Sequence, residues 1–434
     1  MSIKNFPLTK DQLLELSKKY PTPFYLYDEK SIRQNARELN EAFSIFPGYK
    51  EHFAVKALPN PVILRILAQE KIGADCSSLT ELMLADMAGI KGEDIMLSSN
   101  NTPANEYIRA AELGAIINLD DFTHIDFLEK AVKSAGKTRF PELVSCRYNP
   151  GPLKEGNAII GKPEEAKYGF TREQLINGYT LLKSKGVKRF GLHTMVASNE
   201  LSLEYHLETA RLLFELALEI KAKCGISIEL IDLGGGLGIP YRPEQDAIIW
   251  SVLTKGIKEI YDELIVKNGL AGLQIRTEYG RPITGPYGWL VTRAIHKKEI
   301  YRNYIGLDAC MADLMRPALY GAYHHITIPG KENSPLTETY DITGSLCENN
   351  DKFAVQRKLP KISVSAECGD DGDFVIIHDA GAHGRAMGFN YNGKLRCGEL
   401  LLRTDGSFLQ IRRPETAEDY FSTLNIKALE AFNA

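Results

Sequence analysis

The sequence predicts an α/β protein made of a (β/α)8 (TIM) barrel and a second, mostly antiparallel β domain of sandwich-like or barrel-like form. Short apolar runs alternate with longer segments of helical period between about residues 50 and 280. Eight such runs fall within about 230 residues, which matches a closed barrel better than an open doubly wound sheet. After Arg281, short strands separated by Gly, Pro and Asn replace the alternation.

The predicted barrel strands are rich in β-branched and aromatic residues. In chain order they are His52–Lys56, Ile72–Asp75, Ile95–Ser98, Ala115–Leu119, Leu143–Arg147, Arg189–Met195, Ile228–Leu233 and Leu273–Glu278. The helices expected between them are Pro61–Gln69, Leu79–Ala88, Ala104–Leu113, Thr123–Ala135, Arg172–Ser184, Leu203–Cys224 and Asp246–Val266. Ser78 with Glu81 three residues later predicts a capping box at the start of the second helix.

The β domain is predicted from shorter strands. They are Trp289–His296, Tyr304–Leu307, His324–Ile328, Asp373–Asp379 and Glu399–Leu402. Phe24–Tyr27 precedes the barrel, and we expect it to pair into this domain. The expected division is therefore residues 35–285 for the barrel, and residues 1–34 with 286–434 for the β domain.

Composition excludes several classes of protein. The 434 residues are 44% hydrophobic and 25% charged, so the chain can bury a large core. A net charge of -4 without a basic block disfavours nucleic-acid binding. The seven scattered cysteines form no C-x-x-C pair, which argues against a disulfide framework or structural zinc site. With no signal peptide or membrane span evident, we expect a soluble, cytoplasmic protein.

Polar residues gather at the ends of the predicted strands, where barrel enzymes place their active sites. Lys56 closes the first strand, and a partly desolvated lysine has a neutral amine that can attack an aldehyde. The run Gly234–Gly236 can surround a phosphate with backbone N–H groups. A dinucleotide-binding fingerprint is disfavoured, because Ile239–Pro243 follows the glycines where that motif has a helix. Lys56 alone also fits an ordinary surface lysine, and the glycine run alone also fits a tight turn.

Glu278 and Arg281 stand together at the end of the last strand. The carboxylate suits a protonated pyridine nitrogen, and the guanidinium suits a phosphate or carboxylate; a plain ion pair between them is as good a reading of this motif alone. An amine, a phosphate cradle and an acid for a ring nitrogen are together what pyridoxal 5'-phosphate requires.

The sequence resembles the fold-type III pyridoxal phosphate enzymes, and among them most closely the diaminopimelate decarboxylase family. The matching motifs run from Thr22–Asp28 to Tyr391–Asn392. The resemblance implies that Lys56 carries the cofactor and Glu278 keeps its ring nitrogen protonated. The other cofactor contacts that it implies are Asp75, Arg147, His193, Ser198, Gly234, Gly235, Gly236, Gly280 and Arg281.

The β domain carries two further matching motifs, Asp308–Tyr320 and Gly344–Asp351. The first implies that Arg316 and Tyr320 bind substrate. The second implies that Cys347, as general acid, and Glu348, as a substrate contact, reach into the neighbouring subunit's site, so that the enzyme is a homodimer. From the sequence alone, a buried structural thiol is the favoured role for Cys347.

Two positions depart from the family pattern. Met195 stands where the family has a histidine stacked on the cofactor ring, and His383 stands where it has a tyrosine, which leaves the finer substrate contacts open. The resemblance implies decarboxylation of meso-2,6-diaminopimelate to L-lysine and CO2. Alternatives are a decarboxylase of the D-lysine, D-ornithine or carboxynorspermidine type, a less favoured racemase, and a non-catalytic relative that binds cofactor or a partner.

Overall fold

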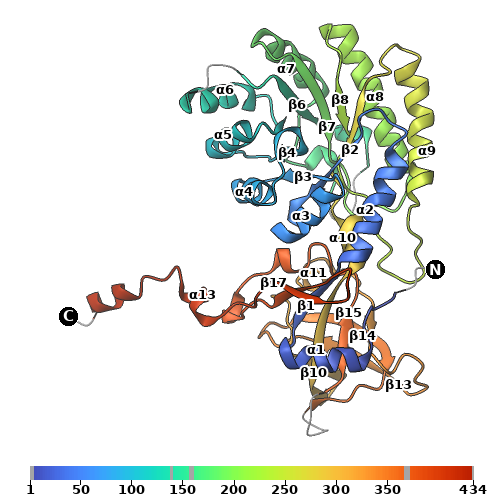
Figure 1. Cartoon of the computed structure of the whole chain (residues 1–434), viewed down its shortest axis with the longest axis vertical. Helices are drawn as coiled ribbons and strands as arrows, with labels where there is room; N and C mark the ends of the chain where they lie inside the picture. Colours follow the sequence, from blue (N-terminus) through green and yellow to red (C-terminus); the bar gives the residue numbers. More distant parts are fainter. Residues whose placement is uncertain (1–3, 137–139, 156–160, 366–371, 433–434) are drawn as a thin grey trace. The chain divides into compact units, whose positions relative to one another are not determined.

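The computed structural model describes residues 4–136, 140–155, 161–365 and 372–432. The chain forms two compact units, one spanning Lys30–Pro286 and the other combining the segment up to Glu29 with the segment from Tyr287 onward (Figure 1). None of the helices in these described residues is both long and apolar enough to cross a membrane.

The first unit is a closed barrel of eight parallel strands, which confirms the predicted (β/α)8 fold. Its strands are β2 (Lys50–Ala54), β3 (Gly73–Cys76), β4 (Ile95–Ser98), β5 (Ile116–Leu119), β6 (Leu143–Tyr148), β7 (Arg189–Thr194), β8 (Leu230–Asp232) and β9 (Gln274–Thr277). The ring closes where β2 pairs with β9, with Lys50 opposite Arg276. All eight carboxyl ends therefore meet at one mouth of the barrel.

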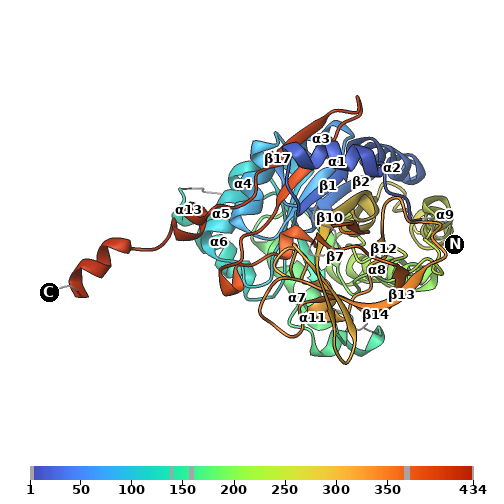
Figure 2. The same ribbon diagram turned by 90° about the horizontal axis from the view of Figure 1, so that it is seen from below.

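The connecting helices cover the outside of the barrel, and α4, α5 and α6 pack next to one another there (Figure 2). The helices of this unit are α2 (Glu29–Phe43), α3 (Pro61–Gln69), α4 (Leu79–Met87), α5 (Ala104–Leu113), α6 (His124–Ser134), α7 (Arg172–Ser184), α8 (Leu203–Cys224), α9 (Trp250–Tyr261) and the short α10 (Arg281–Thr284). Helix α2 is absent from the helices expected from the sequence. It is held to the end of the barrel by Asn35, whose side-chain amide donates to Pro282 O at 2.9 Å.

Local chemistry sets the ends of these helices. Asn60 caps α3 by accepting from Val62 N, and Pro61 occupies the first helical position, where a missing N–H costs nothing. The capping box predicted at Ser78 is incomplete. Ser78 accepts from Glu81 N, but the Glu81 carboxylate turns back to accept from Ser77 N at 2.7 Å.

The second unit is built on a nine-stranded mixed sheet. Its strands are β1 (Phe24–Asp28), β10 (Gly288–Glu299), β11 (Asn303–Leu307), β12 (Ile326–Thr327), β13 (Thr337–Thr343), β14 (Lys352–Pro360), β15 (Phe374–Ile377), β16 (Gly398–Leu402) and β17 (Phe408–Arg412). As expected, the N-terminal strand β1 pairs into this sheet, antiparallel to β10 and parallel to β16. Strands β13, β14 and β17 are not among those expected from the sequence.

The core of this unit lies under its first helix. The helices are α1 (Lys10–Lys19), α11 (Arg316–Tyr320) and α13 (Ala417–Phe421). Leu13 and Leu16 on α1 belong to one buried cluster with Phe24, Trp289 and Ile376 from three strands of the sheet. The cluster stabilises the unit by removing apolar surface from water.

Candidate functional site

Six polar side chains line the mouth of the barrel and contact or face one another. This polar layer consists of Asp75 from β3, Ser98 from β4, Asn118 from β5, His193 from β7, Asp232 from β8 and Glu278 directly after β9. All but Ser98 are buried. Burying this many ionisable groups together is costly unless they have a chemical task, so the layer marks a candidate active site.

Glu278 is the centre of the layer. Its carboxylate accepts a hydrogen bond from Ser98 Oγ at 2.7 Å and lies 3.1 Å from His193 Nε2, while Asn118 Nδ2 donates to Ser98 Oγ at 2.8 Å. Burial raises the pKa of Glu278, but the charge and hydrogen bond of His193, with the hydrogen bond of Ser98, outweigh burial and lower that pKa to about 2. Glu278 is therefore ionised at neutral pH.

Two other acids of the layer behave in the opposite way. Burial, and then the charge of Glu278, raise the pKa of Asp75 and of Asp232 well above the usual range. Carboxyl groups that share a buried site cannot all ionise. The layer thus holds one carboxylate between acids that retain their protons more strongly.

The layer leaves several buried polar atoms unsatisfied. Asp75 Oδ1, Asn118 Oδ1, His193 Nδ1 and Asp232 Oδ2 have no hydrogen-bond partner among the described residues. A buried polar atom without a partner costs about 1–3 kcal/mol. A polar ligand that supplies hydrogen bonds at this mouth would recover part of that cost.

Lys56 lies in a different environment from the one expected. β2 ends at Ala54, and Lys56 belongs to the short 3-10 turn Val55–Ala57 that follows it. The residue is exposed rather than desolvated, because the turn carries its side chain out of the strand. Its amine is nevertheless near the layer, since its charge acts to lower the pKa of Asp75 and Glu278 against the effect of burial.

The run Gly234–Gly236 forms a tight turn directly after β8. Gly234 and Gly236 have φ values of 72° and 91°, which residues with side chains rarely adopt. A Cβ on Gly235 would lie 2.5 Å from Glu278 O, and one on Gly236 would lie 2.5 Å from Ala197 O. The neighbouring backbone therefore requires all three glycines, and the turn brings the segment that contains Ser198 beside it.

Met195 contacts this turn. Gly235 N–H donates to Met195 Sδ at 3.3 Å, so the thioether lies against the middle glycine. His193, two residues earlier, points instead to Glu278.

The two arginines of the site are each supported by a tyrosine. The Arg147 guanidinium lies 4.3 Å from the centre of the Tyr168 ring and donates to Asp120 Oδ1 at 3.3 Å. The Arg281 guanidinium donates to Tyr241 Oη. Both arginines are thereby fixed in orientation before any ligand is considered.

Gly280 allows the end of β9 to approach the turn that carries Lys56. A Cβ on Gly280 would lie 2.8 Å from the Cβ of Ala57. This close approach places Lys56 and Glu278 on neighbouring segments of the barrel mouth.

Sequence reasoning missed several members of the site. They are Ser98, Asn118, Asp120, Asp232 and Tyr241. The first four stand at the carboxyl ends of strands, so the rule that found Lys56 and Glu278 also applied to them. Ser98 and Asn118 are neutral and so were less conspicuous than charged residues, whereas Asp120 and Asp232 each stand one residue away from a predicted strand end, Leu119 and Leu233.

The residues predicted on the second unit are distributed over two loops and a helix. Arg316 begins α11 and is buried, with Nη1 2.8 Å from His324 Nε2. Tyr320, at the end of the same helix, is 49% exposed. His383 is half-buried and has a φ of 55°.

Cys347 and Glu348 are both exposed. The structural role favoured for Cys347 from the sequence alone, that of a buried thiol, is therefore wrong. Asp351 holds their loop beside the Asp308–Tyr320 motif, because its carboxylate accepts from Leu346 N and from Met311 N, both at 2.7 Å. The tertiary structure thus brings the two motifs of this unit together.

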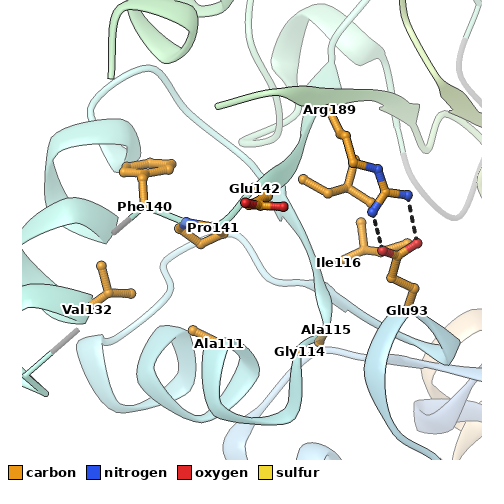
Figure 3. A pocket seen from close by; sticks show the side chains of 11 residues that line it. Glu93, Ala111, Gly114, Ala115, Ile116, Val132, Phe140, Pro141, Glu142 and Arg189 are labelled. Atoms are coloured by element: carbon orange, nitrogen blue, oxygen red, sulfur yellow. Dashed lines mark hydrogen bonds and ion pairs between the residues drawn. The ribbon is translucent and has the colours of Figure 1, made fainter. Parts of the chain in front are cut away.

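A cavity of about 350 Å³ lies at the opposite end of the barrel, where β5, β6 and β7 begin (Figure 3). Its charged lining is already paired, since Arg189 forms an ion pair with Glu93, and Glu142 forms one with Lys188. The active-site chemistry is therefore assigned to the polar layer rather than to this cavity.

Residues 29–285 match the family model described as pyridoxal-dependent decarboxylase, pyridoxal binding domain. Protein TabA of Pseudomonas amygdali pv. tabaci is 40% identical over 428 residues, which cover 99% of this chain and 96% of that protein. The diaminopimelate decarboxylase of Methanothermobacter thermautotrophicus is 32% identical over 418 residues, covering 96% of this chain and 94% of the relative.

A solved structure extends the comparison to three dimensions. The diaminopimelate decarboxylase of M. jannaschii in co-complex with L-lysine superposes with a TM-score of 0.88 at 28% identity, covering 98% of both chains. The likeness includes the barrel and the β unit.

Proposed function

The chain belongs to the family of pyridoxal-dependent decarboxylases, and from this premise we propose that it decarboxylates meso-2,6-diaminopimelate to L-lysine and CO2, the last step of lysine biosynthesis. The observation that carries the proposal is the polar layer, in which Glu278 is held as a carboxylate beside the turn that bears Lys56. Relatives named diaminopimelate decarboxylase support the substrate.

The residues at the barrel mouth fit pyridoxal 5'-phosphate. The layer has buried polar atoms that need partners, the glycine turn offers backbone N–H groups, and an ionised carboxylate is available for a ring nitrogen. When bound, pyridoxal phosphate supplies an electron sink for the pair of electrons left behind by CO2.

Each cofactor-binding residue has a distinct part in the proposal. The Lys56 amine would hold the cofactor through its aldehyde carbon. Gly234–Gly236 and Ser198 would hold the phosphate, while Glu278 would keep a proton on the ring nitrogen. Arg147, whose orientation is fixed by Tyr168, supports the same mouth.

Substrate choice depends on the far end of the amino acid. Diaminopimelate presents an ammonium and a carboxylate there, whereas lysine and ornithine present only a cation. Arg316 and Arg281 can bind the carboxylate, and Glu348 can bind the ammonium. This combination favours diaminopimelate.

We further propose a homodimer with shared sites. Cys347 stands on an exposed loop braced by Asp351, where a thiol can reach a second copy of the chain. From there it would donate a proton to Cα after CO2 leaves.

A second candidate is decarboxylation of another amino acid with a polar or acidic tail, such as the D-lysine, D-ornithine or carboxynorspermidine type. Met195 and His383, which replace a histidine and a tyrosine of the family pattern, favour it. The 40% identity to Protein TabA, a relative with a different name from the decarboxylases, favours it as well.

The test is to incubate the purified protein, with and without pyridoxal phosphate, with meso-diaminopimelate, lysine and ornithine separately, and to measure the CO2 released. We expect cofactor-dependent release from diaminopimelate alone. Release from ornithine but not from diaminopimelate would overturn the substrate, and cofactor binding without release from any amino acid would support a non-catalytic relative.

The covalent role of Lys56 has its own control. Lys56→Ala should abolish the cofactor adduct that borohydride traps, whereas Lys50→Ala should retain it. Lys50 begins β2, the strand that precedes Lys56, at the opposite end of the barrel, where it pairs with Asp94. Persistence of the adduct at full level in Lys56→Ala would show that another lysine is used.

A further inference from the structure

Asp232 is a buried acid that the proposed reaction does not use. It is the last residue of β8, is 0% exposed, and directly precedes Leu233 and the glycine turn. Burying an ionisable group completely is costly, so its two oxygens and their partners are informative.

The first oxygen of Asp232 holds the glycine turn. Its Oδ1 accepts a hydrogen bond from Gly234 N–H at 2.8 Å. Gly234 has a φ of 72°, and a Cβ there would lie 2.1 Å from Thr194 O, so the turn has little freedom at this residue. The hydrogen bond from Gly234 therefore fixes the orientation of the glycine turn relative to β8.

The Asp232 carboxyl group also lies close to Glu278. One ligand atom each from Asp232, Glu278 and His193 lie within 4.8 Å of one another, so the carboxyl groups of Asp232 and Glu278 are close neighbours. The described donors to Glu278 are Ser98, Asn118 and His193, while Asp232 Oδ2 meets no donor among the described residues. A hydrogen bond between two carboxyl groups requires a proton on one of them.

The surrounding charges place that proton on Asp232. Burial, followed by the charge of Glu278, raises the pKa of Asp232, whereas that of Glu278 is lowered to about 2. The charged and titratable groups that face Asp232 from the neighbouring elements are Asp75 on β3, His193 on β7, Arg276 on β9, Glu278 after β9, Tyr279 and Tyr49.

We propose that Asp232 is a positioning residue that, as a neutral acid, donates a hydrogen bond to Glu278 while accepting one from Gly234. It thereby holds the phosphate-binding turn and the carboxylate for the ring nitrogen at a fixed spacing. The inference rests on the proposed function only in taking pyridoxal phosphate as the ligand that both elements bind.

The test compares Asp232→Asn with Asp232→Ala. The amide of asparagine has both a carbonyl to accept from Gly234 and an NH2 to donate to Glu278, whereas alanine has neither. Dissociation constants for pyridoxal phosphate are measured by fluorescence titration without substrate. We expect the asparagine variant to bind within about threefold of wild type and the alanine variant at least about tenfold more weakly, a loss of about 1.4 kcal/mol.

Two results would overturn the proposal. Equal weakening by both substitutions would mean that the site needs a charged Asp232, and unchanged binding by Asp232→Ala would mean that Asp232 does not position the cofactor. Glu51→Gln is the matched control. Glu51 is another fully buried acid, paired with Thr277, and its replacement should leave cofactor affinity unchanged.

An infrared measurement tests the protonation directly and does not require the alanine variant to fold. The difference spectrum between wild type and Asp232→Asn should contain the carbonyl band of a protonated carboxyl group in the wild type. A carboxylate band in its place would contradict the neutral acid. Neither readout depends on CO2 release. The role of Asp232 is therefore tested separately from the substrate, and a failure of diaminopimelate as a substrate would not affect it.

Discussion

Glu278 sets the charge of the barrel mouth, and its ionisation depends on neighbours from other strands. Ser98 and His193 contact its two carboxylate oxygens. Because its folded pKa of about 2 lies below the ordinary value, the ionised form stabilises the folded state above the ordinary carboxyl pKa, and this stabilisation is lost as the pH falls toward 2.

Replacing Ser98 should weaken this effect. Ser98→Ala removes one hydrogen bond to a carboxylate, worth about 1.5–3 kcal/mol, so the pKa of Glu278 should rise by about one to two units. The pH below which the protein no longer binds the cofactor, here called the acid limit, should rise by a similar amount. A titration of cofactor absorbance against pH in the two proteins measures the shift.

Ser99→Ala is the control for this titration, since it deletes a hydroxyl one residue further along the chain. Its acid limit should coincide with that of wild type. If Ser98→Ala also coincides with wild type, Ser98 does not support the ionisation of Glu278.

At the scale of elements, the glycine turn after β8 combines an unusual backbone with close packing. Gly235 is the informative position, because its φ is ordinary and only space excludes a side chain. The turn packs against Glu278 O on one side and Met195 on the other. Any displacement of the turn therefore moves the segments that carry the cofactor contacts.

Gly235→Ala should accordingly reduce both stability and cofactor affinity. The added Cβ would lie 2.5 Å from Glu278 O, and overpacking of this kind costs about 1–3 kcal/mol. Thermal unfolding and a pyridoxal phosphate titration would measure the two effects.

Gly272→Ala provides the comparison, because a Cβ at Gly272 meets nothing within 4 Å and its φ is not positive. We expect this variant to match wild type in both measurements. Equal behaviour of the two alanine variants would show that the turn can relax around a methyl group.

At the scale of the whole molecule, the proposed homodimer predicts complementation between inactive variants. Lys56→Ala removes the cofactor amine of one chain, and Cys347→Ala removes the acid that chain would lend to its partner. In mixed dimers one of the two sites has both groups. Mixing equal amounts, with subunit exchange, should restore about a quarter of wild-type activity, because half of the dimers are mixed.

Each variant alone should remain nearly inactive, so the activity expected of the mixture without complementation is the average of the two separate variants. No recovery above the inactive variants would contradict a site shared between subunits. Size-exclusion chromatography with light scattering establishes whether the chain is a dimer, which the mixing experiment requires.

The sequence by itself determined the order of the eight barrel strands and the presence of Lys56, the glycine turn and Glu278 at their ends. These properties follow from local periodicity and turn chemistry, which neighbouring residues decide. Most helix bounds, such as those of α3, α5, α7 and α8, agree with the prediction for the same reason.

Only the tertiary structure decided how charge is divided among those residues. Ser98 and Glu278 are 180 residues apart in the chain and form a hydrogen bond in the barrel. The exposure of Lys56 and Cys347 and the neutral state inferred for Asp232 likewise depend on what surrounds each group. Burial and through-space electrostatics set these properties, and neither is encoded in the spacing of residues along the chain.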